Sequence, residues 1–339
     1  MYHPSKMTGI PGLANTESKR ATGMHMICRY LDEKTDGKGV IFATGTPLAN
    51  SLSEVYTIMY NLQYKMLEEM GMTNFDSWVS TFAKAEVVQE QSFDSTKYNE
   101  KLRFTEFSNV PELKRMVFEC MDVQTADMLK LPVPDVKRET VLLKPSEIQG
   151  DIMESFAQRA EDYKYKRGNY NPAEMLMITS DARKMALDQR VYDPILPESE
   201  TGKTSACADK IVDIYHQTEE KKLTQMVFCD MSTPGGANSK EFCVYDDLKE
   251  KLIERGIPEA EIAFIHSADT DEKKDKLFKS VREGSVSVIV GSTQKMGTGT
   301  NVQQRLVALH HLDCPWRPSD LEQREGRIIR QGNTFDDVD

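Results

Sequence analysis

The sequence predicts an α/β protein with a parallel β-sheet covered by helices, and three observations support this fold class. Short apolar runs recur after residue 204, and stretches with helical spacing separate them. The chain has 339 residues, which is enough for two domains at about 100–200 residues per domain. Its composition, 39% apolar and 29% charged, is that of an ordinary globular protein, so a disordered chain, collagen and a coiled-coil rod are excluded.

The first predicted elements are a strand, a loop and a helix near the N-terminus. Residues 39–43 (Gly-Val-Ile-Phe-Ala) form a short apolar run that predicts a strand. The polar turn at 44–47 (Thr-Gly-Thr-Pro) follows, and apolar residues then recur with helical spacing over 51–62.

The pattern changes between residues 63 and 202, where charged and methionine-rich helical segments alternate with short breaks. The methionines of 59–72 are interpreted as helix packing. Prolines at 131–134 favour an extended connector, and 140–143 (Thr-Val-Leu-Leu) has the composition of a strand. We therefore expect a mostly helical insertion in this part of the chain.

Regular alternation begins after residue 204 and predicts the parallel sheet itself. The predicted strands are 225–229, 262–265, 286–290 and 306–312, and the predicted helices between them are 245–255 and 271–283. Gly256 and Gly284 follow these two helices and are predicted to act as C-caps.

Near the C-terminus, the residue spacing predicts another helix, which begins at Asp320. Ser319 and Glu322 have the spacing of a capping box. At about 100° per residue, Leu321 and Ile328 share one face, which can pack on the sheet.

Gln323, Arg327 and Arg330 cluster on the opposite face of this predicted helix. Two guanidinium groups pointing out together suit a phosphate whose charge rises in a transition state, because guanidinium is always charged and binds oxygens as a fork. The alternative is a solvated helix face whose arginines pair with nearby acids.

A loop rich in glycine, threonine and serine occupies 291–301, directly after the predicted strand at 286–290. Ligands of open α/β sheets bind beyond the carboxyl ends of strands, where such a loop exposes backbone N–H groups to phosphate. A simple tight turn is the alternative for the loop alone.

Together these segments resemble the conserved motifs of superfamily 2 helicases, especially the Swi/Snf-type branch. The residues that carry the resemblance are 291–303 for motif V, 311–318 (with D-x-x-W-x-P) and 323–332 (Q-x-x-x-R-x-x-R-x-G) for motif VI, 225–229 for motif IV, 44–51 for motif III and 131–149 for the connector between lobes. The residues of motifs III to VI most resemble those in the helicase region of large bacterial phage, plasmid and conjugative-element proteins. Some of these proteins also carry an adenine-specific DNA methyltransferase region.

The resemblance implies a division into three parts. Residues 1–62 would be the C-terminal remnant of a first RecA-like lobe, 63–202 the helical insertion and connector, and 203–339 a second RecA-like lobe, the helicase C-terminal domain. ATP and DNA would bind between two such lobes.

The resemblance also implies roles for individual residues. Arg327 and Arg330 would be catalytic arginine fingers at the γ-phosphate of ATP. The implied ATP-binding residues are Gln323, Gly297, Thr298 and Gly299. The implied nucleic-acid-coupling residues are Thr44, Thr46, Ser292, Thr293 and Asn301. Trp316 is expected to be buried in the core.

Two sequences that such an ATPase needs are missing from the chain. No Walker A loop (G-x-x-x-x-G-K-[ST]) and no D-E-x-H segment occurs. Gly202-Lys203-Thr204 imitates the end of a Walker A loop, but Pro197 stands where its first glycine is required, so we reject it. The sequence is therefore expected to be part of a larger translocase, whose ATP and Mg²⁺ ligands include residues outside this chain, and to be inactive alone.

A second hypothesis is a non-catalytic DNA- or protein-binding module derived from a helicase lobe. The formal net charge of −11 argues against DNA binding by bulk charge but not against a few placed cations. The expected partners are DNA, the missing N-terminal lobe of the same polypeptide and possibly the methyltransferase region. No metal site is predicted, because His310 and His311 near Cys314 lack a spaced fourth ligand. No apolar run can span a membrane, so a cytoplasmic location is expected.

Overall fold

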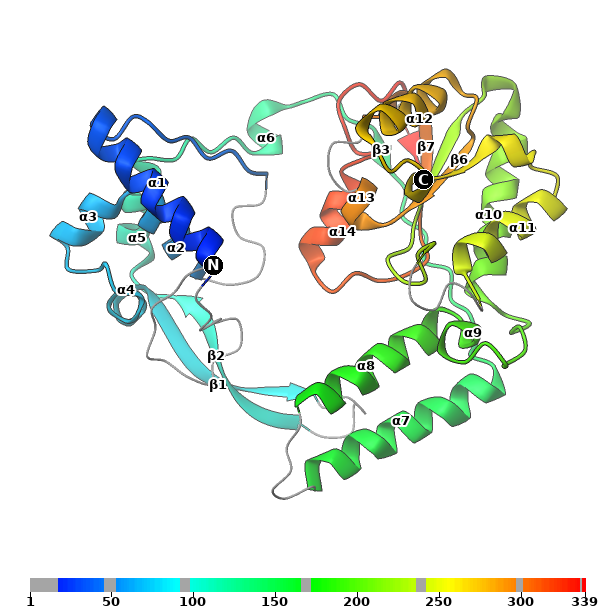
Figure 1. The fold of residues 1–339 in the computed structure, drawn as a ribbon, viewed down its shortest axis with the longest axis horizontal. Helices are drawn as coiled ribbons and strands as arrows, with labels where there is room; N and C mark the ends of the chain where they lie inside the picture. The colour runs from blue at the N-terminus through cyan, green and yellow to red at the C-terminus, as the bar shows by residue number, and fades with distance from the viewer. Residues whose placement is uncertain are drawn as a thin grey trace. The chain divides into compact units, whose positions relative to one another are not determined.

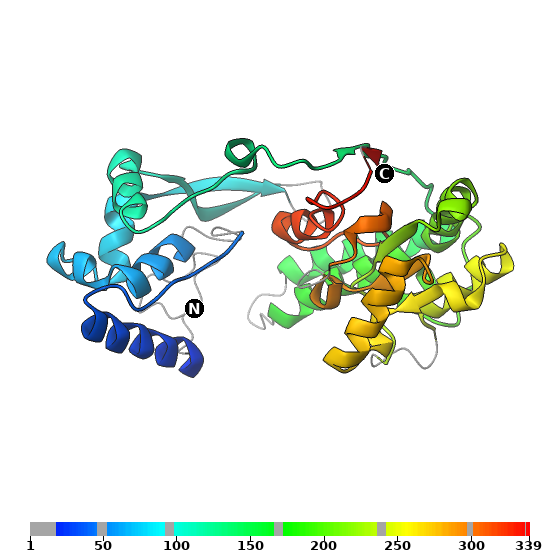
Figure 2. The same cartoon turned by 90° about the horizontal axis from the view of Figure 1, so that it is seen from above.

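The computed structural model describes residues 18–45, 53–91, 98–165, 172–235, 242–296, 301–335 and 337–339. The chain divides into two compact units, residues 1–129 (unit 1) and 130–339 (unit 2). The division falls inside the segment 63–202, so the part that the sequence presents as one insertion is shared between two units. Figures 1 and 2 show the elements of both units.

Unit 1 is a set of short helices with one long β-hairpin. Its elements are α1 (Lys19–Thr35), α2 (Ser53–Leu62), α3 (Tyr64–Glu69), α4 (Phe75–Phe82), β1 (Ala83–Gln91), β2 (Tyr98–Phe107), α5 (Val110–Phe118) and α6 (Ala126–Leu129). The two strands pair antiparallel and form the extended ribbon visible in Figure 1. This hairpin was not predicted from the sequence, because charged residues interrupt the apolar pattern of both strands.

Aromatic and methionine side chains form the core of unit 1. Trp78, Tyr56 and Phe82 are fully buried, and Met59 and Leu67 pack into the same cluster. The helix-packing role predicted for the methionine-rich segment is thereby confirmed for Met59. The buried Tyr56 hydroxyl donates a hydrogen bond of 2.5 Å to the carbonyl of Thr73, so its polar end is satisfied.

The strand predicted at residues 39–43 is absent from unit 1, and this prediction is wrong for the structure. The segment leaves α1 as an extended thread without secondary structure (Figures 1 and 2). Ile41 is 91% exposed. The physical reason is that a strand needs a hydrogen-bonding neighbour, and the described part of unit 1 offers none to this segment.

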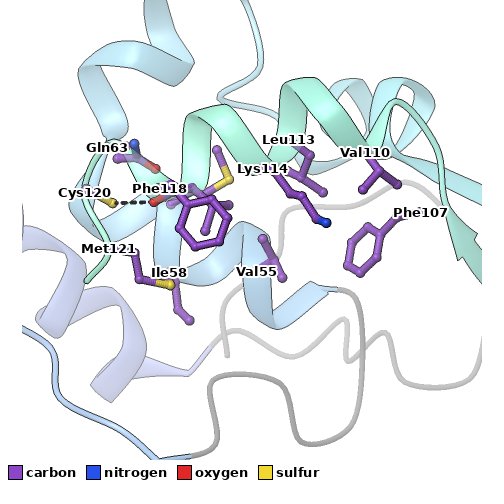
Figure 3. Close-up of a pocket in the computed structure, with 12 residues that line it drawn as sticks. Val55, Ile58, Gln63, Phe107, Val110, Leu113, Lys114, Phe118, Cys120 and Met121 are labelled. Atoms are coloured by element: carbon purple, nitrogen blue, oxygen red, sulfur yellow. Dashed lines mark hydrogen bonds between the residues drawn. The ribbon is translucent and has the colours of Figure 1, made fainter. Parts of the chain in front are cut away.

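An apolar cavity of about 230 Å³ lies in unit 1 between α2 and α5 (Figure 3). Val55 and Ile58 come from α2, and Leu113 and Phe118 come from α5. Gln63 adds an amide, whose Nε2 donates 2.7 Å to the carbonyl of Met116. The cavity is thus walled almost wholly by aliphatic and aromatic groups.

Unit 2 contains a four-stranded sheet in which every pair is parallel. Its strands are β4 (Thr224–Phe228), β5 (Ile262–Phe264), β6 (Val288–Gly291) and β7 (Leu306–His311), in the order β5-β6-β4-β7. All four predicted strands are present, and the predicted α/β fold class with a parallel sheet is confirmed.

Helices cover both faces of this sheet, as Figure 1 shows. One face carries α10 (Lys203–Thr218) and α11 (Val244–Glu254), and the other carries α12 (Asp271–Glu283), α13 (Thr293–Met296) and α14 (Pro318–Glu325). Short 3-10 turns occupy Glu219–Lys221, Glu259–Glu261, Ile265–Ser267 and Gln303–Arg305. Strand residues alternate between the two faces: Val227 packs toward the first set of helices, and Met226 and Phe228 pack toward the second.

Two long antiparallel helices, α7 (Glu147–Tyr165) and α8 (Pro172–Leu187), and the short α9 (Gln189–Tyr192) precede the sheet in unit 2. An ion network fastens α9 to α11. The Arg190 guanidinium binds Asp188 at 2.8 Å and Asp247 at 3.1 Å, and Lys251 binds the same Asp247 at 2.5 Å. The side chains of all four residues are less than 15% exposed, so the charges are largely desolvated and depend on one another.

The connector enters unit 2 as β3 (Asp135–Val136), which pairs parallel with β8 (Asp337–Val338) at the other end of the unit. The strand predicted at 140–143 does not form, and Leu142 is 89% exposed. The prediction of a strand at 140–143 is therefore wrong, and the short strand β3 that the connector does form was not predicted.

Two further features are the state of the cysteines and the length of the apolar helices. All six cysteines are free. In the described ranges, no helix combines the length and apolar character needed to cross a bilayer.

Candidate functional site

Three strands of the unit 2 sheet end at the same edge, and a polar side chain follows each of them. Asp230 lies two residues after β4, Thr293 two residues after β6, and Asp313 two residues after β7. Because carboxyl ends of parallel strands meet at one edge, these three side chains converge. This edge is where a phosphate ligand was predicted from the sequence.

Arg324 of α14 joins the three strand ends. Its Nη2 donates to Asp230 Oδ2 at 2.7 Å and to Asp313 Oδ1 at 2.9 Å. Its Nε donates to the Thr293 hydroxyl at 2.7 Å, and its Nη1 donates to the carbonyl of Asp313 at 2.9 Å. We call this group of four residues the Arg324 junction.

The two carboxylates of the junction also hold backbone and loop groups. Asp230 accepts hydrogen bonds from the backbone N–H of Thr293 at 2.6 Å and from its hydroxyl at 2.8 Å. Asp313 accepts from the backbone N–H groups of Asp230 at 2.5 Å and Met231 at 3.0 Å. The junction therefore ties the first residue of α13, the end of β4 and the end of α14 to one another.

Burial sets the electrostatics of the junction. The side chains of Arg324 and Asp313 are 0% and 1% exposed. Burial by itself would raise the pKa of Asp230, but the hydrogen bonds from Thr293 and the charge of Arg324 outweigh it and hold that pKa below its ordinary value. The junction is thus a buried arginine bound to two carboxyl groups.

The two adjacent histidines of β7 point in different directions. His311 stacks on Phe228, and its Nδ1 lies 3.4 Å from Arg324 Nη1. His310 Nε2 hydrogen-bonds Gln225 Oε1 at 2.9 Å. Burial lowers the pKa of each histidine to about 4, and for His311 the charge of Arg324 adds to the effect. Within the described residues, no group of three or more potential metal ligands exists, and these histidines do not form one.

The structure corrects the predicted C-terminal helix. α14 begins at Pro318, with Arg317 at the N-cap and no side-chain cap, so the capping box of Ser319 and Glu322 does not form. The helix ends at Glu325, and turns follow it. Proline at the first helical position fixes the start, and Gly326 ends the helix because glycine costs about 1 kcal/mol in a helix interior.

Arg327 and Arg330 therefore lie in the turns after α14 and not on its exposed face. Arg327 is half-buried and its Nε donates to the carbonyl of Gln323 at 3.3 Å, whereas Arg330 is exposed. Burial lowers the pKa of Arg327, and the positive charge of Arg330 lowers it further. The structure thus brings the two guanidinium groups and Gln323 together, although by a different backbone path from the predicted one.

The glycine-rich loop is described only at its two ends. Ser292 is buried, and its carbonyl accepts from the backbone N–H groups of Lys295 and Met296 at the start of α13. Asn301 is exposed, and its carbonyl accepts from Arg282 Nη1 at 3.1 Å. Three predicted site residues, Gly297, Thr298 and Gly299, lie outside the described residues.

Two predicted coupling residues, Thr44 and Thr46, belong to unit 1. Thr44 is exposed at the end of the extended segment after α1. Thr46 lies outside the described residues.

Trp316 corrects another expectation, because it is 64% exposed and not buried in the core. The Arg183 guanidinium of α8 lies over its ring, 4.3 Å from the centroid. The same guanidinium donates to the carbonyl of Cys314 at 2.7 Å. The tryptophan therefore holds α8 to the loop that leads into α14.

The Gly202-Lys203-Thr204 segment begins α10, with Gly202 at the N-cap. Turns and irregular backbone precede it, where a P-loop requires a strand. Thr204 is 1% exposed and shares the core-facing side of α10 with Ala208 and Ile211. The local fold is thus unlike that of a Walker A loop.

Arg324 is the site residue that was not predicted from the sequence. A signal was present, since Arg324 stands three residues after Leu321 and four before Ile328, the two residues assigned to the sheet-facing side. A charged side chain in such a position is buried only when it is paired. The aspartates that follow β4 and β7 supply the pairing.

Comparisons with known proteins identify two helicase segments in the chain. Residues 1–125 match a family model described as a probable helicase domain, and residues 207–332 match the helicase conserved C-terminal domain. The Defense against restriction protein B of Escherichia phage P1 is 25% identical over 160 residues, which are 46% of this chain and 7% of that protein. The chain therefore corresponds to a small part of this relative.

Solved structures similar to this chain include two ATPase domains. The Sulfolobus solfataricus SWI2/SNF2 ATPase core domain is 15% identical, with a TM-score of 0.40, and the match covers 97% of this chain and 59% of that one. The C-terminal part of the Fun30 ATPase domain is 14% identical, with a TM-score of 0.37, and the match covers 61% of this chain and 84% of that one.

Proposed function

Starting from the two helicase-family segments, we propose that this chain is part of an ATP-dependent DNA translocase of the Swi/Snf type. In this proposal, unit 2 supplies Arg327 and Arg330 as arginine fingers to the γ-phosphate of ATP, and Gln323 helps to position the nucleotide. The loop from Ser292 to Asn301 would couple the nucleotide state to DNA.

The observation that carries this proposal is the Arg324 junction. It fixes Thr293, where the glycine-rich loop begins, to the helix that leads into Arg327. A change at one of these sites must therefore be transmitted to the other through a rigid buried contact. Such a link suits a translocase in which contacts to the phosphate and contacts to DNA have to change together.

The arginine pair fits a polyphosphate. Burial disfavours the charged form of Arg327, and the nearby positive charge of Arg330 disfavours it further. Both effects lower the pKa of Arg327. An anion between them would relieve the repulsion and accept a forked hydrogen bond from each guanidinium. The charge that develops on a transferred phosphoryl group would be stabilised in the same way.

Mg²⁺ is not accommodated by the described residues. The two carboxyl groups at this edge of the sheet, Asp230 and Asp313, both bind Arg324. The ligands of a magnesium ion, like a Walker A loop, would have to come from residues other than these. The proposal therefore assigns to this chain phosphate contacts and no metal contacts.

The test uses the natural polypeptide that contains this chain, with duplex DNA and Mg²⁺–ATP. Arg327→Ala should lower kcat of ATP hydrolysis by about 10³-fold or more, because an arginine finger acts mainly on the transition state. Lys279→Ala is a matched control, since Lys279 is an exposed cation of the same unit, paired to Glu283 at 3.7 Å. Wild-type kcat in both Arg327→Ala and Arg330→Ala would contradict the finger assignment.

The second hypothesis, a non-catalytic DNA- or protein-binding module, predicts a different result. DNA binding would then persist without any hydrolysis of ATP, and Arg327→Ala would affect only affinity. The attachment of a DNA methyltransferase region stays a prediction from resemblance.

A further inference from the structure

The connector that brings the backbone from unit 1 into unit 2 holds the arginine-bearing segment at two points. The first point is an ion pair, in which Arg138 Nη2 donates to Glu325 Oε2 of α14 at 2.7 Å. The second point is the pairing of β3 with β8, and Figure 2 shows these strands beside the C-terminus. Arg327 and Arg330 stand between the two points in the sequence, so the connector holds both ends of the segment that carries them.

Neighbouring contacts fix the backbone from which Arg138 extends. Arg138 lies two residues after β3. Before it, the Lys137 N–H donates to the Val338 carbonyl at 2.9 Å. After it, Glu139 Oε1 accepts from Lys210 Nζ of α10 at 2.8 Å. The connector is therefore bound to β8 and to α10 on either side of Arg138, and the position of this guanidinium follows the position of the connector.

Glu325 is the residue through which Arg138 reaches the turns after α14. The side chain of Glu325 binds Arg138, and its backbone carbonyl accepts from the N–H groups of Ile328 and Ile329 at 3.0 Å. Glu325 is also the last residue of α14, where the helix dipole disfavours a negative charge unless a cation offsets it. Arg138 supplies this cation. The ion pair thus joins the connector to the residue that starts the arginine-bearing turns.

We propose that Arg138 is a positioning residue for Arg327 and acts through Glu325. The ion pair keeps the first turn after α14 in the place from which Arg327 contacts a phosphate, and a shift of the connector moves this turn. Since the backbone passes from unit 1 to unit 2 through the connector, the connector regulates the arginine pair. This inference rests on the proposed function, because it assigns a control to the same phosphate contacts.

Hydrogen exchange in the 339-residue chain tests the structural part of this proposal without ATP. The N–H groups of residues 327–329 are bonded to the last two carbonyls of α14. Arg138→Glu places a second carboxylate beside Glu325, so these three amides should exchange about 5-fold faster or more, which is the scale of an exposed ion pair. The amides of β4 should keep their rates. Unchanged exchange at residues 327–329 would overturn the proposal.

Lys210→Glu is the matched control for this measurement. It reverses a charge in another exposed ion pair of the same connector, but that pair joins Glu139 to α10 and not to α14. The exchange of residues 327–329 should then change by less than about 2-fold, because an exposed pair acts mainly on its own partners. Equal acceleration by Lys210→Glu and Arg138→Glu would show a general loosening of the connector and would contradict the role assigned to Arg138.

Enzyme kinetics test the functional part in the natural polypeptide, with duplex DNA and Mg²⁺–ATP. Arg138→Glu should lower kcat about 5-fold or more and leave the KM for ATP nearly unchanged, because an arginine finger acts mainly on the transition state. Arg138→Lys keeps the positive charge and should stay close to the wild-type kcat. In a Glu325→Gln background, Arg138→Glu should have little further effect, since the carboxylate that it repels is gone. A full further loss in that background would contradict action through Glu325.

Failure of this inference and failure of the proposed function give different results. If Arg327→Ala lowers kcat and Arg138→Glu does not, the arginine fingers stand and their control by the connector is refuted. If Arg327→Ala leaves kcat at the wild-type value, the finger assignment is wrong. The exchange of residues 327–329 then still decides whether Arg138 positions this turn.

Discussion

The Arg324 side chain is fully buried, so its contribution to the stability of the fold depends on its protein partners. A fully buried guanidinium is costly, and here two carboxylates, a hydroxyl and a carbonyl compensate for its lost hydration. Arg327 and Arg330, by contrast, keep partial access to solvent. The three arginines of one short segment thus divide into one that is fully buried and two that keep contact with solvent.

Removing Arg324 should therefore unfold the chain more readily than removing either of the other two. We expect Arg324→Ala to lower the free energy of unfolding by about 3–5 kcal/mol, because the buried Asp313 would lose the guanidinium that pairs with it. Urea denaturation of the full chain measures this loss. Arg317→Ala should change the stability by less than about 0.5 kcal/mol, since Arg317 is exposed. A small effect of Arg324→Ala, similar to that of Arg317→Ala, would contradict the junction.

His310 gives the chain a predictable response to pH. Its folded-state pKa of about 4 lies below the unfolded value of 6.5, so the unfolded chain binds more protons between these two values. The stability that His310 contributes is complete above pH 6.5 and is lost as the pH falls toward 4. Urea midpoints measured at about pH 7.5 and pH 5 should therefore differ, by an amount worth about 1–2 kcal/mol for this residue.

His310→Gln provides the control for this pH effect. Glutamine can still donate to Gln225 Oε1 but does not titrate, so the difference between the two pH values should shrink. An unchanged difference would assign the effect to other groups, of which His311 is the first candidate because its pKa is also lowered to about 4.

At the scale of the elements, glycines end helices where the following chain must turn closely. Gly284 ends α12 at a φ of 77°, and a Cβ there would lie 2.8 Å from the Lys222 backbone oxygen. Gly256 after α11 has a φ of 100°. Both were predicted from their position after a helical stretch, and both are confirmed, because the left-handed conformation favours glycine.

The same substitution at two glycines should have opposite effects. Gly284→Ala should destabilise unit 2 by about 1–3 kcal/mol, through the left-handed backbone and the close Lys222 oxygen. Gly150→Ala in the interior of α7 should stabilise by about 0.5–1 kcal/mol, since nothing lies within 4 Å of the added Cβ. Thermal unfolding of the two variants beside the unchanged chain makes the comparison, and equal shifts would refute the assignment of strain to Gly284.

Elements that a short stretch of sequence specifies could be predicted. Elements that depend on contacts between distant residues could not. The strands of unit 2 were found because each contains a short apolar run, such as Val288–Gly291. The hairpin of β1 and β2 was missed because cross-strand pairing, and not an apolar run, specifies it. Residues 39–43 carried a local strand signal without the neighbour that a strand needs.

The site shows the same division between local and non-local information. That Arg327 lies near Gln323 and Arg330 was predicted from their spacing, although the helix assumed in that prediction ends at Glu325. The role of Arg324 was not predictable in this way, because its partners Asp230 and Asp313 stand 94 and 11 residues away in sequence and meet it only through the strand order β6-β4-β7. Strand order is a tertiary property that residue spacing does not contain.

At the scale of the whole molecule, the chain contains neither a Walker A loop nor a D-E-x-H segment. We expect the 339-residue chain alone to hydrolyse no ATP, with or without DNA, because arginine fingers cannot replace a Walker A loop and Mg²⁺ ligands. A malachite-green phosphate assay checks this. Hydrolysis at a helicase-like rate that Arg327→Ala abolishes would contradict the prediction.

The proposal predicts that the affinity for DNA falls as the salt concentration rises, in spite of the net charge of −11. Contacts to phosphates release counterions, so the logarithm of the binding constant should fall linearly with the logarithm of salt concentration. Fluorescence anisotropy with labelled duplex DNA between roughly 50 and 200 mM salt, the range over which such contacts weaken most visibly, measures the slope. A slope of zero would speak against phosphate contacts.

The pairing of β3 with β8 has a mechanical consequence. The strand that enters unit 2 and the strand at its other end lie parallel, Lys137 N–H donates 2.9 Å to the Val338 carbonyl, and Asp339 is bonded to β7 through Val307 and Leu309. Tension applied at residues 130 and 339 would pull these neighbours along their length in opposite directions. Their hydrogen bonds would then share the load in shear and would not open one after another. The attachment points of unit 2 are thus arranged to resist stretching without first unravelling the sheet.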